Sequence, residues 1–489
     1  MAVVARSSAP GPPPMCFTGS SIDRSAALLK QKTRGFFAEC LAAPSTRFLL
    51  LHRGAALCRC CEAPSGVLTP WWLTLDQLLS AGVRLELPPD VTGPTLAGHD
   101  LAAVAGSAVT VLLGHVSAEA DDGGGPGWRV AVEWGRHTEA EAEALRQVVV
   151  AAEASVTSSW CGGRELYHKL AWTDAAAVGH AVCATGWQLK ALHCGVSGQA
   201  TVPIEAGAKR RSVDGSSRIY PRIDPCCIML VVSADRTRCL LSHPARLRAG
   251  VWTCLAGFID SCESVEEAVR RETMEEAGIV VGDVELALSQ PWPLGRGGAE
   301  LMIACKAVAR SSEIAVGDTE EYANSDDVRW FTRAEAKDML AAARVAYTYK
   351  APFAQQQRQQ QQQQAQAPVE GAAAGGREDK DHTAPHPYDP QALLTPGPYA
   401  VAYHLIKDWT DEVQTSGPAK PEIPAAAAPV SASTATAALG REEEEEVVVV
   451  ATAALIGGWA FSAGAGEAAC LFISGAAAAT AVSSWVHRR

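Results

Sequence analysis

The sequence predicts a mixed α+β protein, and two observations support this. Apolar runs with the composition of buried strands, at 227–232, 239–241 and 301–304, alternate with helix-like segments at 264–277 and 333–344. Short β-branched runs alternating with amphipathic segments are typical of a compact mixed domain. The 489-residue chain is 48% apolar, which is enough for two or three domain cores.

Changes in composition predict six segments. In chain order these are a disordered or transit tail at 1–17, a mixed N-terminal domain at 18–180, a ribbon segment at 181–219, a catalytic domain at 220–413, a linker at 414–446 and an apolar tail at 447–486. Residues 354–394 form a Gln-rich low-complexity insertion in the catalytic domain, because they hold too few large apolar groups to offset the entropy of ordering.

Charge and cysteine content exclude several classes of protein. The formal net charge is −12 and no dense Lys/Arg cluster stands out, so the chain carries no strong nucleic-acid signature. The 15 cysteines are an odd number scattered along a long chain, which argues against a disulfide scaffold and favours a reducing, intracellular compartment.

The C-terminal tail has two interpretations. Residues 447–466 and 468–486 are uncharged and flank the single Glu467, which is the pattern of a membrane anchor. Most of these residues are small, however, and an Ala/Gly-rich low-complexity tail fits the same composition.

The residues with the clearest chemical signal lie between 257 and 278. Seven identities recur there at fixed spacing: Gly257, Glu263, Arg271, Glu272, Glu275, Glu276 and Gly278. At average residue frequencies such a match arises by chance on the order of once in a billion start positions. Ser264 and Glu267 form a capping box that opens a helix, and Gly278 is placed to close it.

This helix predicts a metal site. At 100° per residue, the stripe of Val265, Ala268 and Val269 continues as three glutamates at 272, 275 and 276. Clustered carboxylates repel one another unless a cation lies among them. Mg2+ or Mn2+ fits, because such ions take carboxylate oxygens together with substrate phosphates.

The seven residues resemble the Nudix box, and the resemblance implies an α/β/α Nudix fold. Glu272 and Glu276 are then the principal metal ligands, with Glu275 as a further ligand or the base. Arg271 and Glu263 are expected to orient these ligands. The resemblance adds the Ala256 carbonyl as a ligand. Thr273 departs from the aliphatic residue usual at its position.

A second motif narrows the resemblance to the NADH pyrophosphatases. Ser289-Gln-Pro-Trp-Pro293 reproduces the element that marks this family, and 220–225 and 396–406 also resemble it. The resemblance implies substrate contacts at six residues: Tyr220, Gln290, Pro291, Trp292, Pro293 and Ala402. The prolines would fix the backbone and hold Gln290 and Trp292 at a cleft.

The chain departs from the family pattern in three places. The family's four-cysteine zinc ribbon keeps only Cys194 here, so zinc is predicted to be absent. The segment 293–302 after Trp292 is longer than in the family. A further metal-binding glutamate is expected before 329–331, with Glu321 as the best candidate and Glu320 as the alternative.

Together these residues predict a Mg2+- or Mn2+-dependent hydrolase that cuts NADH, NAD+ or NADPH into nicotinamide mononucleotide and AMP. The family implies a homodimer. Removal of NAD caps from RNA 5′ ends is an enzymatic alternative, and a non-catalytic nucleotide-binding regulator is another. Cytosol, plastid, mitochondrion and peroxisome stay open as compartments, with or without a membrane tail anchor.

Overall fold

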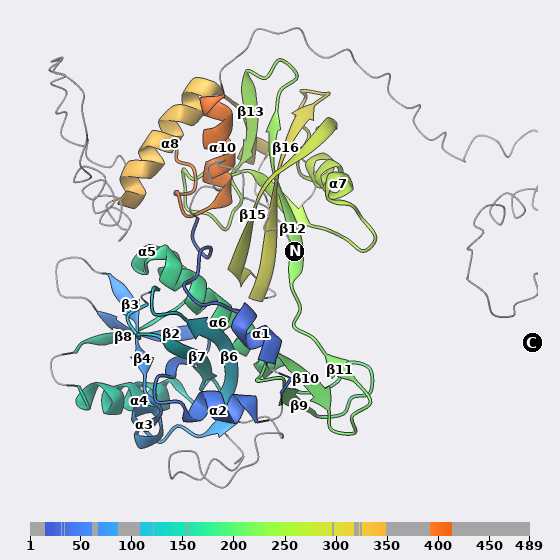
Figure 1. Ribbon diagram of the computed structural model, residues 1–489. Coiled ribbons are helices and arrows are strands. Elements are labelled where there is room, and N and C mark those ends of the chain that lie inside the picture. The colour runs from blue at the N-terminus through green and yellow to red at the C-terminus, as the bar shows by residue number, and fades with distance from the viewer. Residues whose placement is uncertain are drawn as a thin grey trace, which may run out of the picture. The chain divides into compact units, whose positions relative to one another are not determined.

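The computed structural model describes residues 15–30, 32–33, 35–60, 67–86, 108–120, 122–153, 156–295, 298–316, 322, 325–348 and 392–412 (Figure 1). Residues 1–413 cluster as one compact unit. The expected linker and apolar tail, and the insertion as far as residue 391, lie outside the described residues. Within the described ranges, no helix is both long enough and apolar enough to cross a membrane.

The N-terminal part is built on an eight-stranded mixed sheet. Its strands are β1 (Arg47–His52), β2 (Ala55–Cys60), β3 (Leu68–Pro70), β4 (Trp72–Leu73), β5 (Leu85–Glu86), β6 (Ala108–Val116), β7 (Gly127–Glu133) and β8 (Ser158–Cys161). Its helices are α1 (Ser25–Lys30), α2 (Phe36–Ala42), α3 (Leu75–Ser80), α4 (Glu139–Ala151), α5 (Glu165–Lys169) and α6 (Trp172–Lys190). The main strand order is β3-β2-β1-β7-β6-β5, with β4 paired to β1 and β8 to β2.

Two apolar cores include residues from this sheet. One contains Phe37 of α2, Leu78 of α3 and Leu145 of α4, and the other contains Leu166 of α5 and Val178 of α6. Leu50 of β1 belongs to the first core and its neighbour Leu51 to the second, because successive side chains of a strand point to opposite faces. The sheet is therefore covered on both faces.

The start of the chain differs from the expected tail. Met15, Cys16 and Phe17 are buried, at 3%, 0% and 5% exposure. Phe17 packs edge-on against Trp292 with ring centroids 5.7 Å apart. An aromatic and two other apolar side chains gain about 25 cal/mol per Å2 on burial, which orders these residues.

The ribbon is a three-stranded antiparallel sheet in the order β11-β10-β9. Its strands are β9 (Thr201–Ile204), β10 (Lys209–Ser212) and β11 (Arg218–Ile219). Helix α6 continues through the boundary expected at 180/181 and ends at Lys190. The first ribbon strand, β9, begins at Thr201, after this helix has ended.

The catalytic part has a six-stranded sheet in the order β15-β16-β12-β13-β17, with β14 paired to β12. Its strands are β12 (Asp224–Val232), β13 (Arg238–Ser242), β14 (Leu255–Phe258), β15 (Val281–Gly295), β16 (Gly298–Ala309) and β17 (Val328–Thr332). Its helices are α7 (Val265–Ala277), the short 3-10 turn η1 (Ser325–Asp327), α8 (Arg333–Thr348) and α10 (Val401–Asp411).

Strand β12 explains the layering of this part. Cys227, Met229 and Val231 pack in the core under α7, whereas Ile228, Leu230 and Val232 pack in the core under α8 and α10. A continuous apolar run of this kind is needed where both faces of a strand are covered. The α/β/α arrangement and the helices predicted at 264–277 and 333–344 are confirmed (Figure 1).

Candidate active site

Helix α7 forms as its sequence predicts. Ser264 Oγ accepts a hydrogen bond from Glu267 N at 3.2 Å, and Ser264 N donates to Glu267 Oε2 at 2.8 Å. Gly278 closes the helix in the left-handed conformation, with φ of 66°. Ala268 and Val269 lie fully buried against the sheet. The capping box therefore fixes the register that carries the glutamates.

The unusual Thr273 is accommodated without an unpaired polar atom. Its side chain is fully buried, and its Oγ1 donates to the Val269 carbonyl at 2.6 Å. A threonine hydroxyl bonded back one turn satisfies its own donor inside a helix. The departure at this position is thus compatible with the packing of α7.

The two expected metal ligands lie against strand β14. A Cβ added to Gly257 would lie 1.9 Å from the carboxyl carbon of Glu272, so only glycine leaves room for this carboxylate. Glu276 is 4% exposed, and the Ala256 N–H donates to its carboxylate. Both carboxylates therefore lie against the main chain of Ala256 and Gly257 in strand β14.

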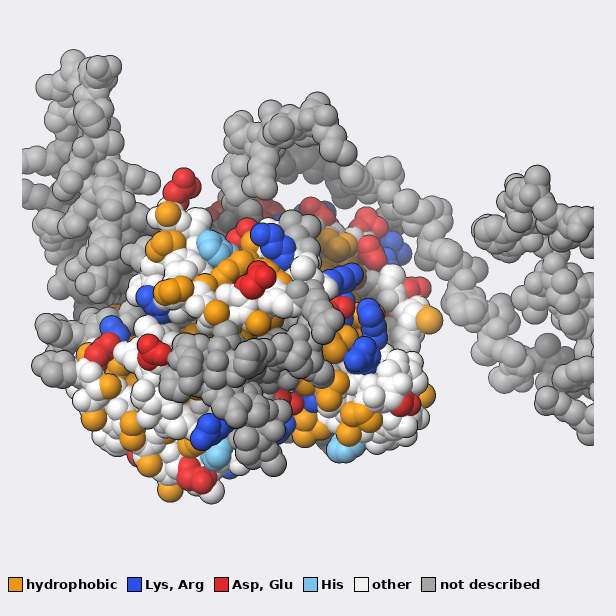
Figure 2. Space-filling model, turned by 60° about the horizontal axis from the view of Figure 1, so that its bottom comes forward, with side chains coloured by type: hydrophobic (Ala, Val, Ile, Leu, Met, Phe, Trp, Pro, Cys, Tyr) orange, Lys and Arg blue, Asp and Glu red, His pale blue; other side chains and the backbone are white. Residues whose placement is uncertain are grey.

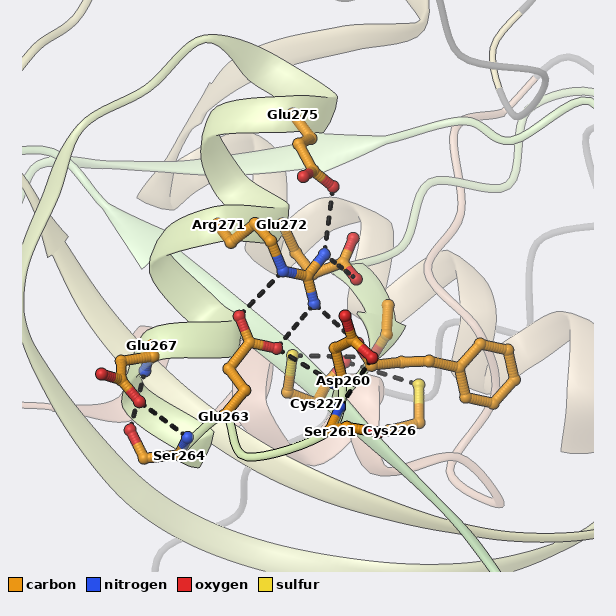
Figure 3. Close-up of polar contacts among 12 residues, drawn as sticks. Cys226, Cys227, Asp260, Ser261, Glu263, Ser264, Glu267, Arg271, Glu272 and Glu275 are labelled. Atoms are coloured by element: carbon orange, nitrogen blue, oxygen red, sulfur yellow. Dashed lines mark hydrogen bonds and ion pairs between the residues drawn. The ribbon is translucent and has the colours of Figure 1, made fainter. Parts of the chain in front are cut away.

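Arg271 organises the rest of the cluster (Figure 3). Its Nε and Nη2 each donate to Glu263 at 2.8 Å, in a bidentate pair. Its Nη1 donates to Glu272 at 2.9 Å and to Glu275 at 3.1 Å. A further bond from Nη2 reaches the Phe258 carbonyl at 2.9 Å. The Arg271 guanidinium thus links the carboxylates of Glu263, Glu272 and Glu275 to the Phe258 carbonyl.

The environment separates the pKa values of these carboxyl groups. Hydrogen bonds from Arg271 lower the pKa of Glu263 to about 2. Burial raises the pKa of Glu272, and burial raises the pKa of Glu276 to about 7. Burial disfavours the ionised form of both neighbouring carboxyl groups, and a cation bound between them would stabilise that form.

The donor set fits a hard divalent cation. Glu272 and Glu276 offer carboxylate oxygen atoms, which are donors that suit Mg2+ or Mn2+. Across the described ranges, no group of three or more His, Cys, Asp or Glu side chains is arranged to hold a metal. Glu320 and Glu321, the candidates for the further ligand, lie outside those ranges.

Sequence reasoning missed Tyr322. Its hydroxyl donates to Glu276 Oε2 at 2.7 Å, and its ring packs against the core under α7. A tyrosine next to the predicted Glu321 was the available signal, but no periodicity or motif singles it out.

The Ser289–Pro293 motif forms part of β15 and lies beside the N-terminal part. Gln290 is 1% exposed, and its side chain is fully used by the main chain: Nε2 donates to Cys16 O at 3.0 Å and Tyr399 O at 2.7 Å, and Oε1 accepts from Val401 N at 2.9 Å. Gln290 therefore joins three segments, rather than presenting its amide to a cleft.

The other predicted contacts fall in different settings. Trp292 is half-buried between Phe17 and Tyr167, Pro293 is buried, and Pro291 is exposed. A Cβ on Gly179 of α6 would lie 3.0 Å from Pro293, so the motif docks closely on that helix. Two further candidates contrast: Ala402 is buried at the start of α10, and Tyr220 is 58% exposed beside Lys209.

The ribbon retains Cys194, whereas the second cysteine pair implied by the family resemblance is missing. Cys194 lies in a turn and accepts hydrogen bonds from the Ser197 hydroxyl and from main-chain N–H groups, which lower its pKa to about 7. On the facing turn, Ser217 N donates to Ser212 Oγ at 2.9 Å. A hydrogen bond from the Ser217 hydroxyl to Cys194 links the two turns. Serine is a poor ligand for zinc.

Comparison with known proteins agrees with this geometry. A family model described as the NUDIX domain matches residues 225–351. The Arabidopsis thaliana protein named Nudix hydrolase 19, chloroplastic, is 36% identical over 272 residues, which cover 55% of this chain and 56% of that protein. The human NAD-capped RNA hydrolase NUDT12 is 40% identical over 179 residues, 35% of this chain and 37% of that protein.

A third relative, the human protein named NAD(P)H pyrophosphatase NUDT13, mitochondrial, is 34% identical over 208 residues, 42% of this chain and 54% of that protein. The chain thus spans about half the length of the curated relatives it matches. Fold and site define a Nudix domain. Residues 225–351 match the NUDIX domain, and the relatives that the chain resembles include proteins named NAD(P)H pyrophosphatase and NAD-capped RNA hydrolase.

Proposed function

We propose that the chain hydrolyses the diphosphate bond of NADH, with NAD+ and NADPH as further substrates, to a nicotinamide mononucleotide and AMP. The observation that carries this proposal is the placement of Glu272 over Gly257 and of Glu276 beside Ala256. The Ser289–Pro293 motif, together with the relative named NAD(P)H pyrophosphatase, supports the choice of dinucleotide.

The chain's own residues would divide the work. Glu272, Glu276 and the Ala256 carbonyl would hold Mg2+ or Mn2+, with Glu321 as a proposed further ligand. A bound divalent ion neutralises charge on the diphosphate and lowers the pKa of a bound water. Arg271 keeps Glu272 and Glu275 in place through its hydrogen bonds to them at 2.9 and 3.1 Å.

Glu275 is the proposed base, because it is 53% exposed and lies one residue from a proposed ligand. It would accept a proton from the attacking water as the new P–O bond forms and the bridging P–O bond breaks. Trp292, Pro291, Pro293, Tyr220 and Ala402 are proposed to bind the nucleotide, with Gln290 holding the segments that carry them.

Product analysis with the full chain tests the reaction. NADH and Mg2+ are incubated with the protein, with and without chelator, and AMP and reduced nicotinamide mononucleotide are quantified. The Glu276→Gln variant should lose turnover because it lacks a ligand oxygen, and Glu266→Gln on the same helix should keep it. Full turnover in chelator or in the Glu276→Gln variant would refute the proposal.

NAD-capped RNA is a second candidate substrate, since the chain is also similar to relatives named NAD-capped RNA hydrolase and the bond cut would be the same. On the face shown in Figure 2, acidic, basic and apolar side chains are interspersed. The formal net charge of −12 favours the free dinucleotide over a polyanion such as RNA. Rates on NADH and on NAD-capped RNA of one sequence would separate the two.

We also propose that the chain acts as a homodimer inside the cell or an organelle, as the family and the chloroplastic and mitochondrial names of two relatives suggest. Light scattering of the purified chain tests the first point. Localisation of the tagged full chain, with and without residues 447–486, tests the second and the proposed tail anchor.

A further inference from the structure

Tyr322 reaches Glu276 from a segment that lies outside the Nudix helix. Its hydroxyl donates to Glu276 Oε2 at 2.7 Å, across 46 residues of sequence. The half-buried ring packs against the apolar core that contains Val269, Ala277 and Ile279. Packing on this core limits the positions open to the ring, so the hydroxyl is held where the carboxylate lies.

The contact matters because Glu276 has few other means of fixing its orientation. Its carboxylate is 4% exposed, and an ionised carboxylate accepts about four hydrogen bonds. The Ala256 N–H supplies one donor and Tyr322 supplies another. These two donors restrict the rotation of the carboxylate and occupy about two of its acceptor positions, which leaves the others for a ligand.

Other groups near the carboxylate do not replace this donor. Arg271 donates its hydrogen bonds to Glu263, Glu272, Glu275 and the Phe258 carbonyl. Arg246 contributes positive charge near Glu276, which lowers the pKa of that carboxyl group. Tyr322 is thus a side-chain hydrogen-bond donor, among the described residues, that orients Glu276.

We propose that Tyr322 is a positioning residue for the metal ligand Glu276, and that its hydroxyl raises the affinity of the site for a divalent cation. The inference rests on the proposed function, because it takes Glu276 as a ligand. Partners that hydrogen-bond to metal-ligating side chains typically change metal affinity by about 10–100-fold when they are removed. Tyr322 acts through Glu276 and need not touch the substrate.

The test measures metal binding directly in the full chain. Mn2+ is titrated into chelator-treated protein without substrate, and free Mn2+ is followed by electron paramagnetic resonance. The Tyr322→Phe variant keeps the ring and removes only the hydroxyl, so we expect Mn2+ to bind about 10–100-fold more weakly. Tyr347→Phe removes a half-buried hydroxyl elsewhere and should leave Mn2+ affinity unchanged.

Steady-state kinetics supply a readout that a purely structural role would not move. In Tyr322→Phe the Mg2+ concentration for half-maximal rate should rise by the same factor, while kcat at saturating Mg2+ stays within about threefold of wild type. A melting temperature in chelator close to that of wild type would show that the fold is kept.

The outcomes separate this inference from the proposed function. Mn2+ affinity within about twofold of wild type in Tyr322→Phe, with binding lost in Glu276→Gln, would overturn the role of Tyr322 and leave the metal assignment intact. Undiminished Mn2+ binding in Glu276→Gln would overturn both. If Tyr322→Phe unfolds, Tyr322→Trp keeps a large ring with an N–H donor, and its Mn2+ affinity decides the same question.

Discussion

Replacing Glu276 with glutamine should stabilise the metal-free chain even though it removes a proposed metal ligand. Glu276 is 4% exposed, and burial raises its pKa from 4.5 to about 7. Folding at neutral pH therefore places the Glu276 carboxyl group in a site that hydrates its ionised form poorly, which costs free energy. Glutamine has nearly the same shape and carries no charge, so it avoids this cost.

The size of the effect follows from the two pKa values. One pKa unit corresponds to about 1.4 kcal/mol, so the gap between 4.5 and about 7 corresponds to about 3 kcal/mol. Because the folded pKa is the higher one, the contribution of the bound proton to stability is complete below about pH 4.5. This contribution is lost as the pH rises toward about 7, and the free energy of unfolding changes little from this cause at higher pH.

Denaturant unfolding in chelator, followed by tryptophan fluorescence, measures the difference between variant and wild type. The free energy of unfolding of Glu276→Gln minus that of wild type should rise by about 2–3 kcal/mol between about pH 5 and about pH 8. Glu266→Gln, on the same helix, serves as the control and should show no such rise. A difference that is constant with pH, or that falls, would refute the argument from burial.

Three other substitutions test separate parts of the structure. Cys262→Gly should raise the free energy of unfolding by about 0.5–1 kcal/mol, because Cys262 has φ of 63° and glycine adopts this conformation without strain; an unchanged melting temperature would contradict this. Gln290→Ala should cost about 3 kcal/mol or more in denaturant unfolding, since three buried main-chain groups lose their partner, whereas Gln147→Ala on exposed α4 should cost little. Arg271→Lys should lower kcat about 10–100-fold because lysine cannot form the bidentate pair with Glu263, and unchanged kcat would show that the pair does not orient the ligands.

The parts of the site that the sequence predicts depend on local rules. The capping box at Ser264, the stop at Gly278 and the stripe of glutamates follow from the helical period alone. Arg271 also meets Glu275 one turn away, as residues four apart on a helix do. Because these contacts span few residues, a single segment determines them, and no knowledge of the rest of the fold is needed.

The parts that the sequence does not predict depend on contacts between distant segments. Gln290 bonds to Cys16, 274 residues away, and to Tyr399, 109 residues away. No periodicity in either segment identifies such a partner, and an amide in a family motif suggests a ligand contact more readily than a structural one. The burial of Met15 and Phe17 was missed for the same reason, since Phe17 packs on Trp292 and α6, whereas Met15 packs in the core under α8 and α10.

The described residues on either side of the segment 349–391 are held by contacts with distant parts of the chain. The aromatic rings of Tyr347 and Tyr399 have centroids 5.4 Å apart. Leu394 also pairs with the backbone at Gly250 and Trp252, so the chain is fixed before α10 begins. These contacts help to place Ala402 and the main-chain partners of Gln290, and neither of them follows from a local rule in the sequence.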